Sequence, residues 1–226
     1  MINVGIIGYG YWGPNLARNF AEISTASVRA VADLDSGKLA AVKRRYPTVN
    51  TTRDLRDLLN DPDLDAIVVA TPVRTHYELA LAALQAGKHV WVEKPMTESS
   101  EQASRLIDEA DRRGLVLAVD HTFVYTGAVR KISELVSSGE LGKVYYYDSI
   151  RVNLGLIQHD VNVISDLAVH DFSILEHILR EHPVAVSANG LSHFPGTPEN
   201  LAYITLFYGS GTIAHINVNW LAPVKV

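Results

Sequence analysis

Apolar runs and helix-period patterns alternate through the first 120 residues of this 226-residue chain. Short runs rich in Val, Ile and Ala predict buried strands at residues 2–7, 28–33, 66–70, 89–92 and 116–119. Apolar positions at helical spacing predict helices between them, at residues 14–22, 38–46, 76–86 and 100–113. Continuously apolar strands that alternate with helices indicate an α/β domain, in which a doubly wound parallel sheet is covered on both faces.

The pattern changes after about residue 121. A helix predicted at 127–138 leads into a strand at 144–152, and a second long helix is predicted at 161–180. Strand-like runs follow at 184–191, 202–208 and 212–219, and Gly209-Ser210-Gly211 between the last two is a hairpin signal. This half is typical of an α+β domain, with an antiparallel sheet and helices on one face. We therefore expect two domains, at residues 1–120 and 121–226.

A glycine-rich turn connects the first predicted strand to the first predicted helix. It reads Gly8-Tyr9-Gly10-Tyr11-Trp12-Gly13, which has the G-x-G-x-x-G spacing of a dinucleotide-binding turn. The first glycine permits a tight turn, the second lets the backbone approach a pyrophosphate, and the third lets the helix pack closely on the strand. N–H groups at the helix N-terminus favour phosphate. The turn, including Tyr11 and Trp12, is the predicted cofactor site.

Asp33 ends the second predicted strand, 20 residues after Gly13. A carboxylate at this position can accept hydrogen bonds from the hydroxyls of an adenosine ribose. The same carboxylate would repel a 2′-phosphate. The sequence therefore favours NAD over NADP as the cofactor.

The composition is that of an ordinary globular protein, with 47% hydrophobic and 20% charged residues. The net charge is −5 and there is no basic stripe, so we expect no nucleic-acid partner. The sequence has no cysteine, which excludes disulfides and thiolate-ligated metal sites. No apolar run approaches the roughly 20 residues that span a bilayer. We also see no signal peptide, and we expect a cytoplasmic protein without a membrane partner.

Lys94 follows the predicted strand at 89–92, within the motif Glu93-Lys94-Pro95. A proline disfavours helical backbone in the residue before it, which gives the Lys94 side chain a defined direction. Ligands of parallel sheets bind at the carboxyl ends of the strands. Lys94 is therefore expected near the nicotinamide end of a bound cofactor, with a solvated surface lysine as the alternative.

The long helix of the second half contains Asp166 and His170, which share a face because they are four residues apart. An imidazole titrates near neutral pH and can act as a general base, while Asp166 could orient it or hold a substrate hydroxyl. The alternatives are a helix cap for Asp166 and a satisfied, partly buried ring for His170. Nearby His159, Asp160 and His177 complete no compact metal-binding signature, so we expect no catalytic metal.

The glycine-rich turn, the Glu93-Lys94-Pro95 motif and the pair Asp166 and His170 resemble the Gfo/Idh/MocA oxidoreductases over essentially the whole chain. The resemblance implies a Rossmann domain followed by an α/β domain with an open, mostly antiparallel sheet. It implies NAD(P)-dependent oxidation or reduction of a hydroxyl, usually on a sugar or cyclitol, with Lys94, Asp166 and His170 as catalytic residues. The positions that match the family's cofactor-side segments are Thr71, Pro72, His76, Glu93 and Lys94.

Residues 153–164 and 219–226 look like the sugar-nucleotide branch of this family, similar to UDP-N-acetylglucosamine 3-dehydrogenases and their uronic-acid relatives. The implied substrate is a nucleotide-linked sugar such as UDP-N-acetylglucosamine, and the alternative is a free sugar or an inositol-like cyclitol. Arg151, Asn153 and Asp160 are weaker candidates for substrate contact, because a strand-to-loop segment could present them. Ordinary loop polarity explains these three residues equally well.

The sequence ends at Val226, where relatives in this family continue for further strands and helices. We therefore expect the second domain to be an incomplete substrate and oligomerisation domain. Sheet edges left exposed tend to find partners, which favours a homo-oligomer formed through the C-terminal sheet. The alternative to an active dehydrogenase is an NAD-binding module that senses the cofactor without turnover.

Overall fold

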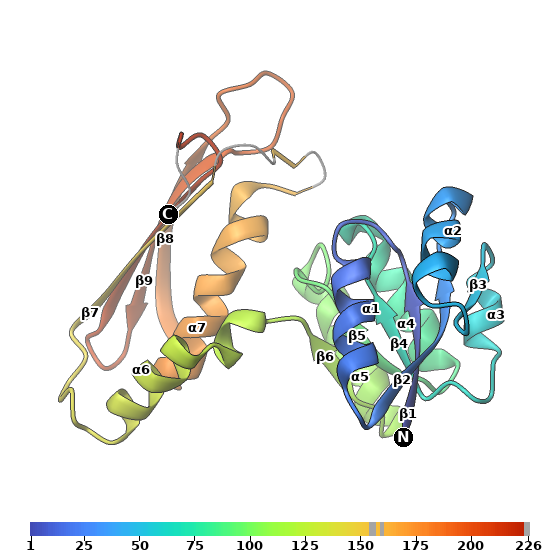
Figure 1. The fold of residues 1–226 in the computed structure, drawn as a ribbon. Coiled ribbons are helices and arrows are strands. Elements are labelled where there is room, and N and C mark those ends of the chain that lie inside the picture. The colour runs from blue at the N-terminus through green and yellow to red at the C-terminus, as the bar shows by residue number, and fades with distance from the viewer. Residues whose placement is uncertain (154–156, 159–160, 224–226) are drawn as a thin grey trace. The chain divides into compact units, whose positions relative to one another are not determined.

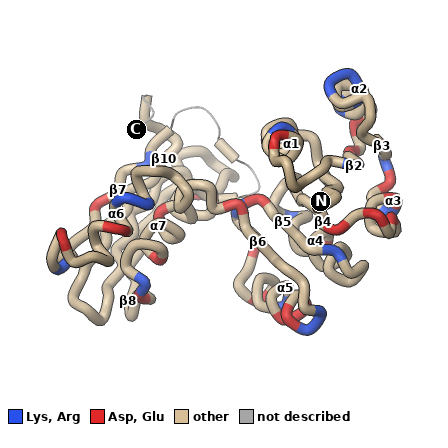
Figure 2. Tube along the Cα trace, turned by 60° about the horizontal axis from the view of Figure 1, so that its bottom comes forward, with Lys and Arg blue, Asp and Glu red and all other residues tan. Residues whose placement is uncertain are grey.

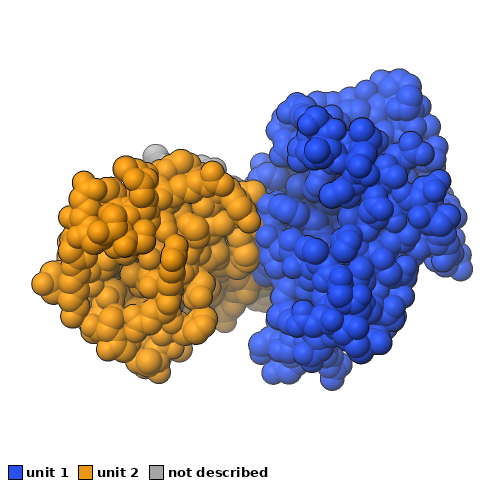
Figure 3. Space-filling view, turned by 90° about the horizontal axis from the view of Figure 1, so that it is seen from below, with its two compact units in different colours: residues 1–120 blue, residues 121–226 orange. Residues whose placement is uncertain are grey.

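The computed structural model describes residues 1–153, 157–158 and 161–223 (Figure 1). The chain divides into two compact units, Met1–Asp120 and His121–Val226, which Figure 3 colours blue and orange. Each unit has its own hydrophobic core. Within the described ranges, no helix is both long and apolar enough to cross a membrane.

Six parallel strands form the sheet of the first unit. They are β1 (Ile2–Ile7), β2 (Ala26–Ala32), β3 (Asn50–Thr52), β4 (Ala66–Val69), β5 (His89–Val92) and β6 (Leu117–Val119). Their order in the sheet is β3-β2-β1-β4-β5-β6, which is the order of the doubly wound dinucleotide-binding fold. The predicted Rossmann topology is therefore confirmed. The strand order reverses between β1 and β4, where such sheets bind ligands beyond the carboxyl ends of their strands.

Helices cover both faces of this sheet. They are α1 (Gly13–Glu22), α2 (Ser36–Arg45), α3 (Arg56–Leu59), α4 (His76–Gln85) and α5 (Ser100–Arg113), with a 3-10 turn η1 (Val73–Thr75) before α4. One core contains buried side chains of α4 and α5, and a second contains those of α1 and α2. The helix ends follow local chemistry. The Asp35 carboxylate accepts a hydrogen bond from the Gly37 N–H and so caps the N-terminus of α2. Basic residues in the last turn of α2 interact favourably with the partial negative charge at its C-terminus (Figure 2).

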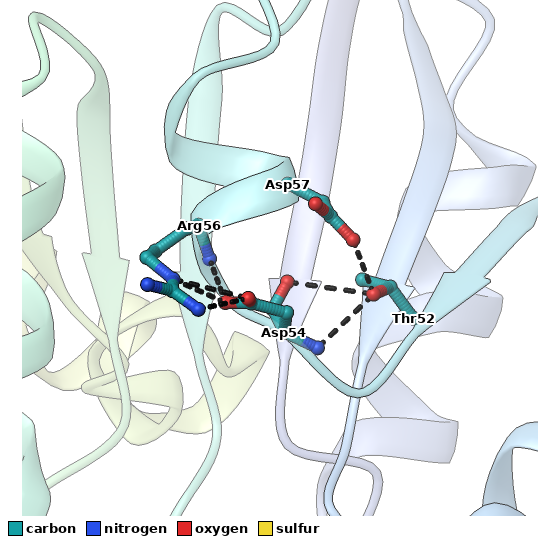
Figure 4. Close-up of polar contacts among 4 residues, drawn as sticks. All are labelled: Thr52, Asp54, Arg56 and Asp57. Atoms are coloured by element: carbon teal, nitrogen blue, oxygen red, sulfur yellow. Dashed lines mark hydrogen bonds and ion pairs between the residues drawn. The ribbon is translucent and has the colours of Figure 1, made fainter.

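The sequence patterns did not predict β3 or α3, because periodicity cannot be recognised over three or four residues. Polar contacts define this region instead (Figure 4). The Thr52 hydroxyl donates to the carboxylate of Asp57, and it accepts a hydrogen bond from the Asp54 N–H at 3.0 Å. Hydrogen bonds from Arg56 lower the pKa of Asp54 to about 2. These contacts hold the short helix beside the edge strand.

The second unit contains a four-stranded mixed sheet with helices on one face (Figure 1). The strands are β7 (Tyr146–Val152), β8 (Pro183–Leu191), β9 (Leu201–Tyr208) and β10 (Ile213–Asn219), in the order β7-β10-β9-β8. Two of the pairings are antiparallel, and β7 and β10 are parallel. The helices are α6 (Gly127–Ser137) and α7 (Val169–Leu179), and a 3-10 turn η2 (Thr122–Tyr125) precedes α6. The expected open, mostly antiparallel α+β architecture is confirmed.

The structure corrects the prediction of a single regular helix over residues 161–180. The structure has a π-helical turn, η3 (Ile164–Ala168), which runs into α7. Such turns occur mostly as local bulges and often at functional sites. Asp166 lies in the π turn and His170 in the first turn of α7, so the four-residue spacing does not have the geometry of one regular α-helix.

Candidate active site

The glycine-rich turn lies at the carboxyl end of β1, beside the reversal of strand order. Gly8 has a φ of +97°, and a Cβ atom there would lie 2.5 Å from the carbonyl oxygen of Ala70. A Cβ on Gly13 would lie 2.4 Å from the carbonyl oxygen of Gly8. The packing of the turn therefore requires both glycines. At Gly10 the space is open, because a Cβ there would meet no described atom within 4 Å.

The turn leads directly into the N-terminus of α1. Pro14 occupies the first turn of this helix, where a missing N–H costs nothing. In the described part of the chain, Trp12 makes no side-chain hydrogen bond that caps the helix. The first N–H groups of a helix lack intrahelical acceptors and carry partial positive charge. The open backbone at Gly10 and this helix end together fit a pyrophosphate group.

Asp33 directly follows β2 and holds the glycine-rich turn. Its Oδ2 accepts a hydrogen bond from the Tyr9 N–H at 2.7 Å, and its Oδ1 accepts one from the Asp35 N–H at 2.8 Å. The Lys38 Nζ lies 3.7 Å from Oδ2. Each carboxylate oxygen has a second lone pair, so Asp33 can still accept a hydrogen bond from a hydroxyl. These residues therefore fit the ribose and pyrophosphate of a dinucleotide.

His76, the first residue of α4, joins two loops at the same edge of the sheet. Its side chain is 1% exposed. The Nε2 atom lies 2.8 Å from the carbonyl oxygen of Thr71, and the Nδ1 atom lies 2.9 Å from that of Pro95. Each ring nitrogen thus contacts one backbone carbonyl oxygen. His76 therefore ties the loop of Thr71 and Pro72 to the loop that follows Lys94.

Glu93 and Asp120 form a buried pair of carboxyl groups at the ends of β5 and β6. The Glu93 N–H donates to the carbonyl oxygen of Val69, and the Asp120 N–H donates to that of Val92. Burial, the charge of Asp120 and a hydrogen bond with Asp120 together raise the pKa of Glu93 to about 8. Near neutral pH, the buried pair therefore shares a proton beside Lys94.

Lys94 shares the sheet edge with the glycine-rich turn. The strand register aligns Ile7 of β1 with Val69 of β4, and Val69 with Val92 of β5. The turn begins one residue after Ile7, and Lys94 follows Val92 by two residues. The peptide bond between Lys94 and Pro95 is cis. The parallel sheet thus brings both motifs to the carboxyl ends of neighbouring strands.

In the second unit, Asp166 is held by a tryptophan from the end of β10. The Trp220 Nε1–H donates to Asp166 Oδ2 at 3.1 Å, and the Trp220 side chain is almost completely buried. The Asp166 N–H also donates to the carbonyl oxygen of Asn162 at 3.1 Å. The hydrogen bond between Trp220 and Asp166 joins residues 54 positions apart. In the sequence, Trp220 stands out only as part of the family-like segment 219–226, and nothing there pairs it with Asp166.

His170 lies against the ring of Phe123, and the Arg151 guanidinium contacts the same ring. The ring centres of His170 and Phe123 are 4.7 Å apart and the rings are tilted by 59°. The Arg151 guanidinium carbon lies 4.4 Å from the centre of the Phe123 ring, and Arg151 Nε–H donates to Asp171 Oδ2 at 2.9 Å. Neither Phe123 nor Asp171 is among the site residues predicted from the sequence. The available signal was the alternation along β7, which puts Tyr147, Ser149 and Arg151 on one face.

The remaining candidate residues are less informative. Asn153 follows β7, and its N–H donates to the carbonyl oxygen of Asn219 at 3.0 Å. Asp160 lies outside the described residues. Among the residues that the structure describes, no group of three or more His, Asp or Glu side chains could hold a metal ion.

Two family models match this chain. The model described as an oxidoreductase family with an NAD-binding Rossmann fold matches residues 2–121. The model described as the GFO/IDH/MocA C-terminal domain matches residues 129–225. The boundary between the two matches lies close to the division between the two compact units.

Similar proteins support the same assignment. The chain is 30% identical to UDP-N-acetylglucosamine 3-dehydrogenase of Acidithiobacillus ferrooxidans, over 95% of this chain and 66% of that protein. It is 28% identical to myo-inositol 2-dehydrogenase of Thermotoga maritima, over 84% of this chain and 58% of that protein. The solved structure of GenD2 from gentamicin A biosynthesis, in complex with NAD, is 27% identical with a TM-score of 0.93, and the match covers 99% of this chain and 67% of that one.

The chain therefore spans about two thirds or less of the length of these relatives. Both of its units are nevertheless matched. The first unit has the strand order, glycine-rich turn and strand-end acid of an NAD-binding Rossmann domain, and the second has the matching C-terminal sheet. From the fold, the cofactor turn and both family matches, we conclude that this chain belongs to the Gfo/Idh/MocA family of oxidoreductases.

Proposed function

We propose that this protein is an NAD-dependent dehydrogenase that transfers a hydride between nicotinamide and a secondary hydroxyl or ketone of a sugar. The observation that carries the proposal is the placement of Lys94 at the same sheet edge as the open glycine-rich turn. A dinucleotide bound at this turn would extend along the carboxyl ends of the strands. Relatives of this chain are named dehydrogenases of inositols and of a UDP-sugar.

In the proposed oxidation, the substrate carbon loses a hydride, the hydroxyl oxygen loses a proton, and a carbonyl group forms. NAD supplies the hydride-accepting chemistry. The ammonium group of Lys94 donates a hydrogen bond to the reacting oxygen and stabilises the negative charge that develops on it. His170 accepts the hydroxyl proton as general base. Asp166, fixed by Trp220, orients the imidazole or holds a neighbouring sugar hydroxyl.

The proposed substrate is a nucleotide-linked sugar such as UDP-N-acetylglucosamine. The support is the similarity to UDP-N-acetylglucosamine 3-dehydrogenase, which extends over 95% of this chain. A free sugar or cyclitol is the second candidate. It is supported by the similarity to myo-inositol 2-dehydrogenase, which extends over 84% of this chain.

The test is to mix the purified chain with NAD and either UDP-N-acetylglucosamine or myo-inositol, and to follow NADH formation. Lys94→Ala and His170→Asn should each lower kcat by about 10²–10⁴-fold. The Kd for NADH, measured by fluorescence titration, should change little in His170→Asn. Full turnover in Lys94→Ala would refute the role of the lysine. Tight NADH binding without turnover on any sugar tested would favour an NAD-sensing module instead.

The outer face of the second sheet supports self-association. On the face opposite the buried core, exposed apolar and aromatic side chains gather, namely Tyr146, Ile150, Tyr203, Phe207 and Ile213. Asp148 and His215 lie among them, with their side-chain atoms 3.5 Å apart. We expect this face to pair with the same face of a second copy. Asp148 of each copy would then lie near His215 of the other copy. Phe207→Glu should then convert a dimer to a monomer in light scattering, whereas the exposed Ile107→Glu in α5 should not.

A further inference from the structure

A buried carboxylate, Asp171, directly follows the proposed base His170 in α7. Only 1% of Asp171 is exposed. Its Oδ1 accepts hydrogen bonds from Ser149 Oγ at 2.5 Å and from the Tyr147 hydroxyl at 3.3 Å, and its Oδ2 accepts one from Arg151 Nε at 2.9 Å. The three donors occupy alternate positions of β7, so they face the same side of the sheet. They bind the carboxylate from one strand.

Arg151 and Asp171 form an ion pair that is largely shielded from solvent. A carboxylate removed from water requires charged or hydrogen-bonding partners, and Arg151 provides the opposite charge. Burial, followed by the charge of Asp171, raises the pKa of Tyr147 to about 12. The Tyr147 hydroxyl therefore stays protonated near neutral pH and acts as a donor to Asp171. The Tyr147 hydroxyl thus remains a donor over the range in which an imidazole titrates.

The cluster reaches His170 through an aromatic ring. Arg151 has its guanidinium carbon 4.4 Å from the centre of the Phe123 ring, which is within the range of a cation–π contact. The same ring lies 4.7 Å from the His170 imidazole. The contacts therefore run from Asp171 to Arg151, from Arg151 to Phe123, and from Phe123 to His170. They close a circuit, because His170 and Asp171 are neighbours in the chain.

We propose that Arg151 is a positioning residue that holds Phe123 against the imidazole of His170, while Asp171 holds Arg151 in place. The inference rests on the proposed role of His170 as general base. A planar guanidinium can bind a carboxylate with Nε and cover an aromatic ring at the same time, and a lysine cannot reproduce both contacts with the same geometry. Arg151 therefore acts through Phe123 and not as a substrate contact.

The two roles for Arg151 predict different kinetics. A substrate contact that binds ground state and transition state alike changes KM and leaves kcat unchanged. A residue that orients the base changes kcat, because a small displacement of a reacting group can cost about 10²-fold in rate. Arg151→Gln and Phe123→Leu should therefore each lower kcat by about 10- to 100-fold with little change in KM. Arg151→Lys should recover part of this loss, because the cation is retained.

A second measurement reports on the ring itself. In NMR spectra of the histidine side chains, the ring-proton signals of His170, assigned with His170→Asn, should shift in Phe123→Leu and in Arg151→Gln. The matched control is the exposed pair Arg130 and Tyr125, in which the guanidinium carbon lies 5.8 Å from the ring centre. Arg130→Gln and Tyr125→Leu should leave the His170 signals and kcat unchanged.

The outcomes separate this inference from the proposed function. Unchanged His170 signals in both Arg151→Gln and Phe123→Leu, or a raised KM with normal kcat in Arg151→Gln, would overturn the positioning role. If His170→Asn retains turnover, the proposed base is wrong, while the NMR shifts still decide whether Arg151 and Phe123 hold the ring. If Arg151→Gln does not fold, Phe123→Leu carries the test, because it leaves the ion pair in place.

Discussion

The backbone N–H of Tyr9 donates a hydrogen bond to the Oδ2 atom of Asp33 at 2.7 Å. This bond joins the turn after β1 to the end of β2. The acid expected to bind the ribose of NAD thus also holds the turn expected to bind its pyrophosphate. A change at Asp33 should therefore affect both cofactor affinity and the choice between NAD and NADP.

Asp33→Asn should weaken NADH binding by about 10-fold, because a hydrogen bond to a neutral amide is weaker than one to a carboxylate. The same change removes the repulsion of a 2′-phosphate and leaves Lys38 beside the site, so the preference for NADH over NADPH should narrow. Fluorescence titrations with both cofactors measure the ratio of Kd values. Asp35→Asn, at the cap of α2, is the control and should keep the ratio of the parent protein. An unchanged ratio in Asp33→Asn would contradict the prediction.

Alanine substitutions at two glycines of the same turn should have different effects, one on stability and the other on NADH binding. Gly13→Ala should lower the free energy of unfolding by about 1–3 kcal/mol, because the added Cβ would lie 2.4 Å from a backbone oxygen. Gly10→Ala should leave stability unchanged, since the described structure has no atom within 4 Å of its Cβ, and should weaken NADH binding. Thermal unfolding and NADH titration of both variants provide the test. Equal destabilisation by the two changes would argue against an open site at Gly10.

The buried pair of Glu93 and Asp120 predicts a dependence of stability on pH. The pKa of Glu93 in the folded protein is about 8, above its ordinary value of 4.5. Between these values the folded protein binds more protons than the unfolded chain, so the free energy of unfolding should fall as pH rises. The contribution is complete below the unfolded pKa and is lost as pH passes through the folded one.

Glu93→Gln should flatten this dependence, because the amide does not titrate. Denaturant unfolding at several pH values between those two pKa values measures the slope. The exposed Glu98→Gln should keep the slope of the parent protein. A slope in Glu93→Gln as steep as in the parent would place the titrating group elsewhere.

His76→Gln should weaken the connection between the loops that follow β4 and β5. The amide can donate to one of the two carbonyl oxygens, of Thr71 or of Pro95, but not with the geometry of the ring. Leaving a buried carbonyl without its partner costs about 1–3 kcal/mol, so thermal stability and NADH affinity should both fall. The exposed His182→Gln should change neither. Normal NADH affinity in His76→Gln would show that the two loops do not depend on this ring.

Trp220→Phe should lower kcat more than it changes the KM for the sugar, because Asp166 loses the indole N–H that fixes its carboxylate. Trp91→Phe is a matched control, since the buried indole nitrogen of Trp91 has no hydrogen-bond partner in the described structure. The comparison requires kcat and KM for all three proteins. If both variants lose kcat equally, the effect comes from packing and not from the bond to Asp166.

Much of the first unit could be predicted from the sequence. The strands and helices follow from apolar periodicity and capping residues, and the glycine-rich turn and Asp33 follow from their spacing. These signals can be read along the chain, because they depend on periodicity within an element or on a fixed spacing between consecutive elements. The parallel sheet then requires Lys94 and the glycine-rich turn to lie at the same edge, since both follow the carboxyl ends of their strands.

The sequence by itself predicted the order of the longer elements, the α/β and α+β character of the two units, and the residues that we propose bind the cofactor. Only the tertiary structure decided that His76 joins two loops, that Trp220 binds Asp166, and that Arg151 covers Phe123 beside His170. The physical reason is range. Each of these contacts depends on strand register and on the packing of segments far apart in the chain, and no local pattern of hydrophobic and polar residues specifies which distant side chains meet.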